Sequence, residues 1–297
     1  MSRPEAGDPV DVTVAVLRDW RLPEPGADKE SRGRTLIIGG SARTPGAVLL
    51  AAEAAMRSGA GKLQVATAAS VATAVAVALP EALVLPLAET PAGAIDPSAA
   101  ASVLELAADA SAVLIGSGAI EKEDTIAFMS AVVPRLRGPL VVDALGLAYL
   151  TEDLTRVRHL EGRVVLTPNL RELALMLDRE LAMIEKDPQQ AAVALAERTG
   201  ATVTAGGPES WTATPDGQTW RDPSGGTGLG VSGSGDVFAG IVTGLCARGA
   251  EPAQAAVWAA YLHGRAGDRL AAAVGRIGFL ARELPACVPV VLSEIEI

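Results

Sequence analysis

The sequence contains few of the residues that build covalent frameworks or metal clusters. Its 297 residues include two cysteines, Cys246 and Cys287, and two histidines, His159 and His263. Two cysteines do not make a disulfide framework, and two histidines exclude a histidine-rich metal site. Aromatic residues make up only 3% of the chain, so its core must be built mainly from alanine, valine and leucine.

Basic residues and long apolar runs are also scarce. The chain has 25 Lys and Arg against 35 Asp and Glu, which gives a net charge of −10 and a pI near 4.8. This balance argues against nonspecific binding to nucleic acid or to an anionic membrane surface. No run reaches the roughly 18 apolar residues of a membrane span, and the first ten residues lack the apolar core of a signal peptide. We therefore expect a cytoplasmic protein with neither a nucleic-acid nor a membrane partner.

The composition is that of a globular protein, with 49% hydrophobic and 20% charged residues. Residues 1–34 are rich in proline, glycine and charge, and they are predicted to form an N-terminal arm with one short helix over 12–19. No change of composition marks a linker in the rest of the chain. The sequence therefore predicts a single α/β domain over residues 35–297.

From residue 35 onward, short β-branched runs alternate with longer runs of alanine and leucine. Strands are predicted over 35–38, 63–67, 83–87, 112–115, 140–142, 164–167 and 202–204. Helices are predicted over 47–58, 70–79, 98–108, 125–136, 171–177, 188–199, 235–247 and 252–273. This alternation is typical of a mainly parallel sheet with helices on both faces. The turn signal Pro215-Asp216-Gly217 predicts an antiparallel hairpin between 210–214 and 218–220.

Small residues follow two of the predicted strands. Gly39-Gly40-Ser41 comes after the strand 35–38, and Gly116-Ser117-Gly118 comes after the strand 112–115. Ligands of such sheets lie beyond the carboxyl ends of the strands. Glycines there let a ligand approach the backbone, although an ordinary tight turn explains them equally well.

Polar side chains follow the next two strands along the chain. Asp143 ends the strand 140–142, where it could hold Mg²⁺-bound water near a phosphate or cap the turn after it. Asn169 and Glu172 follow the strand 164–167. They could face a ligand or a metal-bound water, or they could form a capping box at their spacing of three residues. The residues alone leave these alternatives open.

The strongest motif is the glycine-rich segment before the helix 235–247. Gly233, Ser234 and Gly235 can present consecutive backbone amides to an anion, and the start of a helix adds partial positive charge. Asp236 follows in the first helical turn, where a carboxylate suits a general base that takes a hydroxyl proton as a phosphoryl group arrives. The Walker pattern is absent, because no lysine follows the loop. The alternative is a plain glycine loop with Asp236 as an acid favoured by the helix dipole.

With these motifs the chain resembles the ribokinase-like superfamily and, within it, the ADP- or ATP-dependent NAD(P)H-hydrate dehydratases. The matching pieces are Ile38-Gly39-Gly40-Ser41, Arg57-Ser58-Gly59-Ala60-Gly61, Pro80-Glu81, Gly116-Ser117-Gly118, Asp143-Ala144-Leu145, Thr167-Pro168 with Glu172, and Ser232-Gly233-Ser234-Gly235-Asp236. The resemblance implies a ribokinase-like three-layer α/β/α sandwich with a mainly parallel central sheet.

The resemblance also implies an activity and a set of ligands. The reaction would repair hydrated NADH or NADPH: a nucleotide phosphorylates the ring hydroxyl, and phosphate then leaves by elimination. ADP or ATP would be the co-substrate, Mg²⁺ the cofactor and a homo-oligomer the assembly. The catalytic base would be Asp236, which would also bind the substrate.

Further site residues come from the same resemblance. The implied substrate-binding residues are Ala47, Gly118, Asn169 and Asp236. The implied nucleotide-binding residues are Ala205, Gly206, Gly207, Pro208, Glu209, Gly233, Ser234 and Gly235. Asp143 and Glu172 would contact the metal through water.

Three positions depart from the family pattern. Asn169 stands where the family has histidine, Ala205 where it has lysine, and Gly146 where it has asparagine. Asparagine keeps a hydrogen bond but loses any proton-transfer role. The missing lysine removes a counter-charge to phosphate, so a lysine restored at 205 is expected to tighten nucleotide binding. A kinase for another small hydroxyl compound and a noncatalytic nucleotide-binding protein therefore remain as alternatives.

Overall fold

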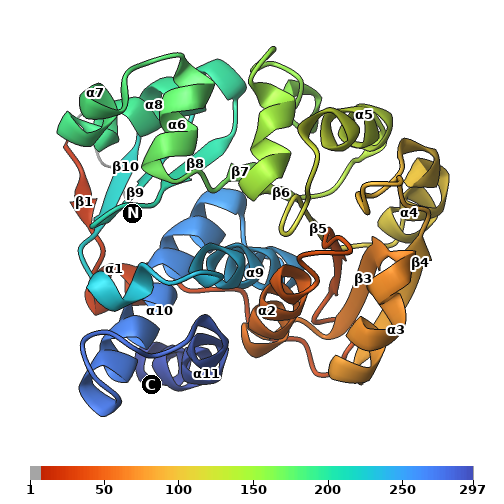
Figure 1. Ribbon diagram of the computed structural model, residues 1–297. Coiled ribbons are helices and arrows are strands. Elements are labelled where there is room, and N and C mark those ends of the chain that lie inside the picture. Colours follow the sequence, from red (N-terminus) through yellow and green to blue (C-terminus); the bar gives the residue numbers. More distant parts are fainter. Residues whose placement is uncertain (1–7, 297) are drawn as a thin grey trace.

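The computed structural model describes residues 8–296, and within them the chain forms one ten-stranded sheet (Figure 1). The strands are β1 (Val10–Asp11), β2 (Arg34–Ile38), β3 (Lys62–Ala68), β4 (Ala82–Leu87), β5 (Ala112–Ile115), β6 (Leu140–Val142), β7 (Val164–Leu166), β8 (Thr202–Ala205), β9 (Ser210–Ala213) and β10 (Thr219–Asp222). Their order in the sheet is β1-β10-β9-β8-β7-β6-β5-β2-β3-β4. Only β9 runs antiparallel to its neighbours, which confirms the mainly parallel sheet and the hairpin.

Helices cover both faces of this sheet. They are α1 (Val14–Asp19), α2 (Gly46–Arg57), α3 (Ala69–Ala78), α4 (Ala100–Ala107), α5 (Lys122–Val132), α6 (Leu170–Leu177), α7 (Leu181–Lys186), α8 (Pro188–Thr199), α9 (Ser234–Ala247), α10 (Pro252–Ala273) and α11 (Leu284–Glu296). The core on one face contains residues of α2, α3, α9 and α10, with α11 packed outside against α2 and α10, and the core on the other face contains residues of α4, α5, α6 and α8. The three-layer α/β/α sandwich is therefore confirmed.

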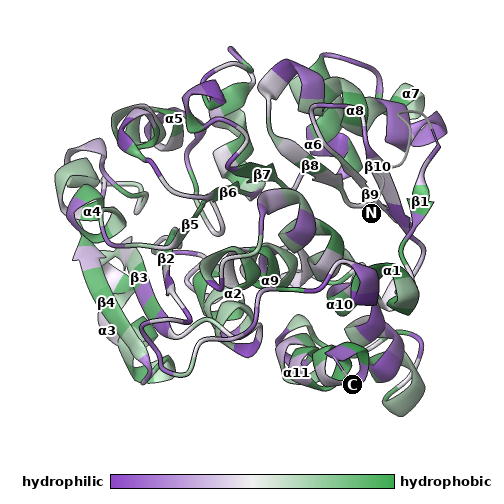
Figure 2. Ribbon diagram, turned by 180° about the vertical axis from the view of Figure 1, so that it is seen from behind, coloured by the Kyte–Doolittle hydropathy of each residue, from purple (hydrophilic) through white to green (hydrophobic). Residues whose placement is uncertain are grey.

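Alternate residues of the central strands supply the two apolar cores. In β2, Ile37 points into the core beneath α2 and α9, whereas Leu36 and Ile38 point into the core beneath α4 and α5. A strand buried on both faces must be apolar at every position, which is why these strands appear as continuous apolar runs in the sequence. Figure 2 shows this apolar colouring on the central strands β6 and β7 and on helices α2 and α9.

The elements absent from the sequence prediction each have a local explanation. Strand β1 has only two residues and helix α7 only six, so neither produces a hydrophobic period. Helix α11 contains Pro289 in its interior, and proline is a helix-breaking signal. The turn expected after Asp143 is a 3-10 helix over Ala144–Leu150.

The segment predicted as an arm packs onto the sheet. Strand β1 pairs in parallel with β10, and Leu17 of α1 is fully buried. Trp20 stacks on Trp220 at a ring-centroid distance of 5.5 Å. The helix predicted over 12–19 is present as α1, and Thr13 caps its start. The first seven residues of the arm lie outside the described part of the chain. The domain boundary at residue 35 remains a prediction.

The strand order reverses between β2 and β5. The two strands are neighbours, but the helix after β2 (α2) and the helix after β5 (α5) lie on opposite faces of the sheet. The loops at their carboxyl ends therefore diverge and leave a crevice, which is the usual ligand position in such sheets. This topology places Gly39-Gly40-Ser41 opposite Gly116-Ser117-Gly118.

Candidate active site

The two glycine loops touch across the crevice. The amide of Gly40 donates to the carbonyl of Ser117 at 2.8 Å, and the Thr44 hydroxyl donates to the carbonyl of Gly118 at 2.7 Å. Gly118 has a φ of +68°, and a Cβ there would lie 2.8 Å from the Cβ of Ala47. Glycine is thus required at 118 by both conformation and space. Ala47 and Gly118, the two small residues predicted to bind substrate, lie side by side.

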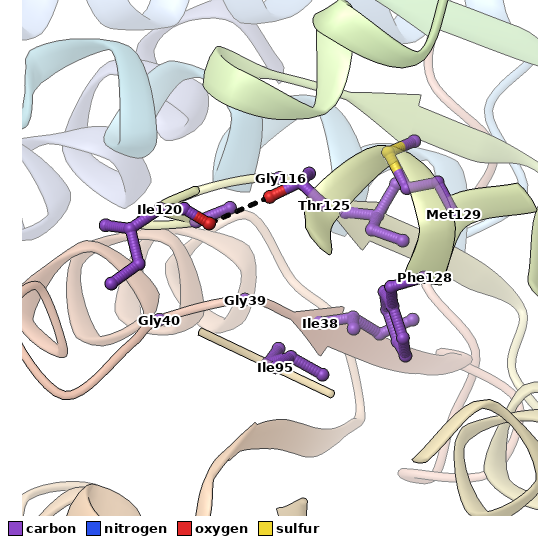
Figure 3. A pocket seen from close by; sticks show the side chains of 11 residues that line it. Ile38, Gly39, Gly40, Ile95, Gly116, Ile120, Thr125, Phe128 and Met129 are labelled. Atoms are coloured by element: carbon purple, nitrogen blue, oxygen red, sulfur yellow. Dashed lines mark hydrogen bonds between the residues drawn. The ribbon is translucent and has the colours of Figure 1, made fainter. Parts of the chain in front are cut away.

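A small apolar cavity lies behind these loops (Figure 3). Figure 3 shows Ile38 and Phe128 facing it, with Gly39 and Gly116 at its edge. The Thr125 hydroxyl is turned to the carbonyl of Ile120 at 3.1 Å. The cavity measures about 20 Å³, which suits about one water molecule and is far too small for a nucleotide. The cavity lies behind the crevice loops and is not itself the ligand site.

Asp143 lies at the carboxyl end of β6 and is buried, with 5% of its surface exposed. Its Oδ2 accepts from the Ser117 hydroxyl at 3.2 Å, and its Oδ1 accepts from the Thr167 hydroxyl at 2.7 Å. Burial raises the pKa of Asp143, and these two hydroxyls oppose the rise. Asp143 also stands at the N-cap position of the 3-10 helix after it, and the backbone amide of Ala144 favours the charged form of its carboxylate.

Asp236 lies in the first turn of α9 and is partly buried. Burial raises its pKa to about 6, and the charge of Asp143 adds to the rise. The Ser117 hydroxyl lies beside the Asp236 carboxylate and favours its charged form. Ser117 therefore stands between two carboxylates from distant parts of the chain. A base with such a pKa can accept a proton at neutral pH.

The start of α9 carries free backbone donors. Gly233 precedes the helix with a φ of +90°, in the left-handed region that favours glycine. The amide of Ser234 bonds to the carbonyl of Val231 at 3.2 Å, so it is already occupied. The amides of Gly235 and Asp236 have no hydrogen-bond acceptor within residues 8–296. The amide of Gly233 likewise has no acceptor within the described residues, so these three amides, at the positive end of a fourteen-residue helix, remain as donors for an anion.

Asn169 and Glu172 form the capping box that the spacing allows. Asn169 Oδ1 accepts from the amides of Arg171 and Glu172 at 2.9 and 3.0 Å, and Glu172 Oε2 accepts from the amide of Asn169 at 2.9 Å. The pKa of Glu172 is raised by burial and also by the charge of Asp143. Glu172 thus lies near Asp143, as the metal-water prediction requires. Within residues 8–296 no three acidic, histidine or cysteine side chains gather to hold a metal unaided.

The segment Ala205–Glu209 is only partly open. Ala205 is completely buried in the core beneath α6 and α8, so position 205 is not an open vacancy for a lysine. Gly206, Gly207 and Pro208 are exposed, and the amide of Gly206 donates to the carbonyl of Pro168 at 3.0 Å. Arg221 donates twice to Glu209, at 2.8 and 2.7 Å, and holds the pKa of that carboxyl below its usual range.

The remaining departure from the family pattern has a steric basis. A Cβ at Gly146 would lie 2.9 Å from the carbonyl of Ile115 and 3.0 Å from the Cα of Gly116. A larger side chain at 146 would press on the loop after β5. The chain therefore has glycine where that loop packs against the 3-10 helix following Asp143.

Three further residues contribute to the site without a predicted role. Ser117 and Thr167 lie within quoted motifs, but only the folded chain shows that both contact Asp143. His263 of α10 contacts Ser234 at the start of α9. In the sequence, His263 stands out because the chain has just two histidines.

Comparison with known proteins identifies related chains. Residues 35–289 match the family model described as NAD(P)H-hydrate dehydratase. The ADP-dependent (S)-NAD(P)H-hydrate dehydratase of Xanthomonas campestris is 45% identical over 285 residues, which cover 96% of each chain. A bifunctional NAD(P)H-hydrate repair enzyme of Moorella thermoacetica is 36% identical, and the match covers 89% of this chain and 50% of that enzyme.

Solved structures agree with the sequence matches. The ADP/ATP-dependent NAD(P)H-hydrate dehydratase of Bacillus subtilis, co-crystallised with ATP and Mg²⁺, superposes with a TM-score of 0.80 at 27% identity. That match covers 98% of this chain and all of the other. Bacillus subtilis pyridoxal kinase, at 16% identity and a TM-score of 0.53, shares the fold alone.

Proposed function

The chain belongs to the NAD(P)H-hydrate dehydratase family, and we propose that it dehydrates hydrated NADH and NADPH at the expense of ADP or ATP. The observation that carries this proposal is the position of Asp236. Through Ser117 it lies at the crevice lined by Ala47 and Gly118, and it lies next to the free amide of Gly235. A hydroxyl in the crevice and a phosphoryl group at the helix start would therefore meet at one carboxylate.

The chemistry follows from that arrangement. Asp236 takes the proton of the ring hydroxyl while the hydroxyl oxygen bonds to the terminal phosphorus of the nucleotide. The bond from that phosphorus to the bridging oxygen breaks, and AMP leaves if ADP is the donor, or ADP if ATP is. The ring carbon then loses phosphate with its C–O electron pair, and the neighbouring carbon loses a proton. The products are the reduced cofactor, inorganic phosphate and the shortened nucleotide.

The backbone at α9 serves the phosphoryl group during transfer. The amides of Gly235 and Asp236 would bind its equatorial oxygens, and the helix dipole would stabilise their charge. Gly206, Gly207 and Pro208 are open to solvent and would border the nucleotide. Glu209 is neutralised by Arg221, so it would not repel the phosphates. The fully buried Ala205 would contribute only backbone.

The residues present fit a Mg²⁺ ion that keeps most of its waters. Asp143 and Glu172 offer carboxylates near each other, and Mg²⁺ is often held by one or two carboxylates together with substrate phosphates. When bound, the ion would neutralise phosphate charge. Asp143 would orient one of its waters, since both carboxylate oxygens are fixed by Ser117 and Thr167. Asn169, exposed at the start of α6, would hydrogen-bond the substrate while its Oδ1 caps the helix.

We extend the proposal to the setting of the enzyme. Across residues 8–296 no helix combines the length and the apolar composition that a membrane span needs. We propose a cytoplasmic location, where the reduced cofactors are used, and a homo-oligomer. Exposed apolar side chains on and after α10 and on α11, among them Val274, Ile277 and Val290, support the second point. Light scattering on the purified protein would measure its mass in solution.

One assay tests the proposed function. The protein is incubated with hydrated NADH, Mg²⁺ and either ADP or ATP, and the absorbance of reduced nicotinamide and the free phosphate are both followed. Repair gives equal amounts of the two products. A stable phosphoester without recovered absorbance would instead identify a kinase for a hydroxyl compound, and nucleotide binding without turnover would identify a noncatalytic protein.

A further inference from the structure

A half-buried histidine of α10 contacts the helix start that carries the proposed base. His263 Nε2 lies 3.0 Å from the hydroxyl of Ser234, the first residue of α9. Its ring also meets Phe238 edge to face, with centroids 5.7 Å apart. Burial lowers the pKa of His263 to about 4, so the ring is neutral at physiological pH. His263 thus contacts the residues two before and two after Asp236.

The turns of α10 beside His263 hold the rest of the glycine-rich segment. Asp268 Oδ1 accepts from the amide of Gly225 at 3.1 Å. A Cβ at Gly264 would collide with Ser224, and a Cβ at Gly267 would lie 2.7 Å from Leu229. The same stretch of α10 therefore fits closely against the loop that leads into α9. The loop has little internal regular structure, so its position depends on these contacts.

We propose that His263 is a positioning residue that holds the first turn of α9, and with it Asp236 and the phosphate-facing amides, in place on α10. The inference rests on the proposed function, because only phosphoryl transfer requires Asp236 and the amides of that turn to be held in exact positions. The hydrogen bond and the ring contact of His263 both go to α9, whereas the crevice loops after β2 and β5 form the substrate side of the site. Its loss should therefore misplace the base and the anion donors while leaving the binding of the hydrated cofactor intact.

Kinetics of matched variants test this role. His263→Phe keeps a ring against Phe238 but removes the contact with Ser234, and Ser234→Ala removes the same contact from the other side. We expect each to lower kcat by about tenfold or more, since misplacement by about 1 Å can cost a hundredfold. The KM for hydrated NADH should stay within about twofold of wild type. The double variant should be no slower than the slower single variant, because both changes remove one interaction.

Gln254 provides the control for a merely structural effect. It is buried on the same helix, but its side chain donates to the carbonyls of Trp20 and Arg21, away from α9. Gln254→Leu should lower the unfolding temperature and leave kcat within about twofold of wild type. The proposal is overturned if His263→Phe lowers the unfolding temperature without lowering kcat, or if the losses of the two single variants multiply.

Nuclear magnetic resonance gives a readout that needs no turnover. The chain has two histidines, so ¹⁵N-histidine labelling yields two ring systems, and His159 contacts the carbonyl of Val133 in another part of the fold. Saturation with ADP should shift the ring signals of His263 and leave those of His159 in place, and Ser234→Ala should abolish the shift. Unchanged His263 signals at saturation would overturn the proposal. An inactive wild type with these shifts present would instead refute the proposed function alone.

Discussion

Asp143 raises the pKa of Asp236, although the first residue ends β6 and the second begins α9. The Ser117 hydroxyl lies between them and donates to Asp143 at 3.2 Å. Both carboxylates differ from surface acids, because their burial makes the charged form of each costly. Burial and, after it, the charge of Asp143 raise the pKa of Asp236 to about 6, which makes this aspartate a stronger base than one on the surface.

The pH dependence of the reaction should follow Asp236. The base must be ionised to accept a proton, and its pKa in the free protein is about 6. We expect kcat/KM to rise tenfold per pH unit below about 6 and to level off above it. Asp143→Asn should move the midpoint to lower pH by removing the neighbouring charge. A profile that is flat between pH 5 and 8 would remove Asp236 from the role of base.

Replacing Asp236 should lower the activity of the protein and raise its stability. Asp236→Asn is expected to lower the rate by about 10²–10⁴. The folded-state pKa of about 6 lies above the ordinary value of 3.8, so the ionised group destabilises the native state above pH 4. At pH 7 the variant should gain roughly 1–3 kcal/mol in free energy of unfolding. The gain should shrink as the pH falls from 6 to 4, and denaturant titrations at both ends would measure it.

The anion donors can be tested one amide at a time. Gly235 is exposed, and a Cβ there meets no atom within 4 Å. Gly235→Ala keeps the amide, whereas Gly235→Pro removes it at a helix position that tolerates proline. Calorimetry should find the affinity for ADP nearly unchanged in the alanine variant and about tenfold weaker in the proline variant. Equal affinities in both would mean that this amide does not bind phosphate.

The buried position 205 reverses one expectation from the sequence. A lysine there was expected to tighten nucleotide binding, but Ala205 has no exposed surface and lies in an apolar core. Burying an ammonium group without a partner is costly. Ala205→Lys should therefore lower the unfolding temperature by several degrees without tightening ADP. Tighter ADP binding in a protein of unchanged stability would restore the original view.

The central strands and the major helices could be predicted because their apolar runs have the period and length of buried elements. The order of β2 and β5 could not, since it depends on which strands pair, and it is this pairing that opens the crevice. The glycine loops and Asp236 were visible as local motifs. Ser117 and His263 acquire their roles only through contacts with Asp143 and Ser234, which lie 26 and 29 residues away along the chain.

The most direct test of the account is a coupled measurement on hydrated NADH with ADP and Mg²⁺. Absorbance of the reduced nicotinamide and release of inorganic phosphate are recorded together for wild type and for Asp236→Asn. We expect the wild type to yield the two products in a one-to-one ratio and Asp236→Asn to yield neither above background. Turnover by Asp236→Asn at the wild-type rate, or phosphate release without recovered NADH, would contradict it.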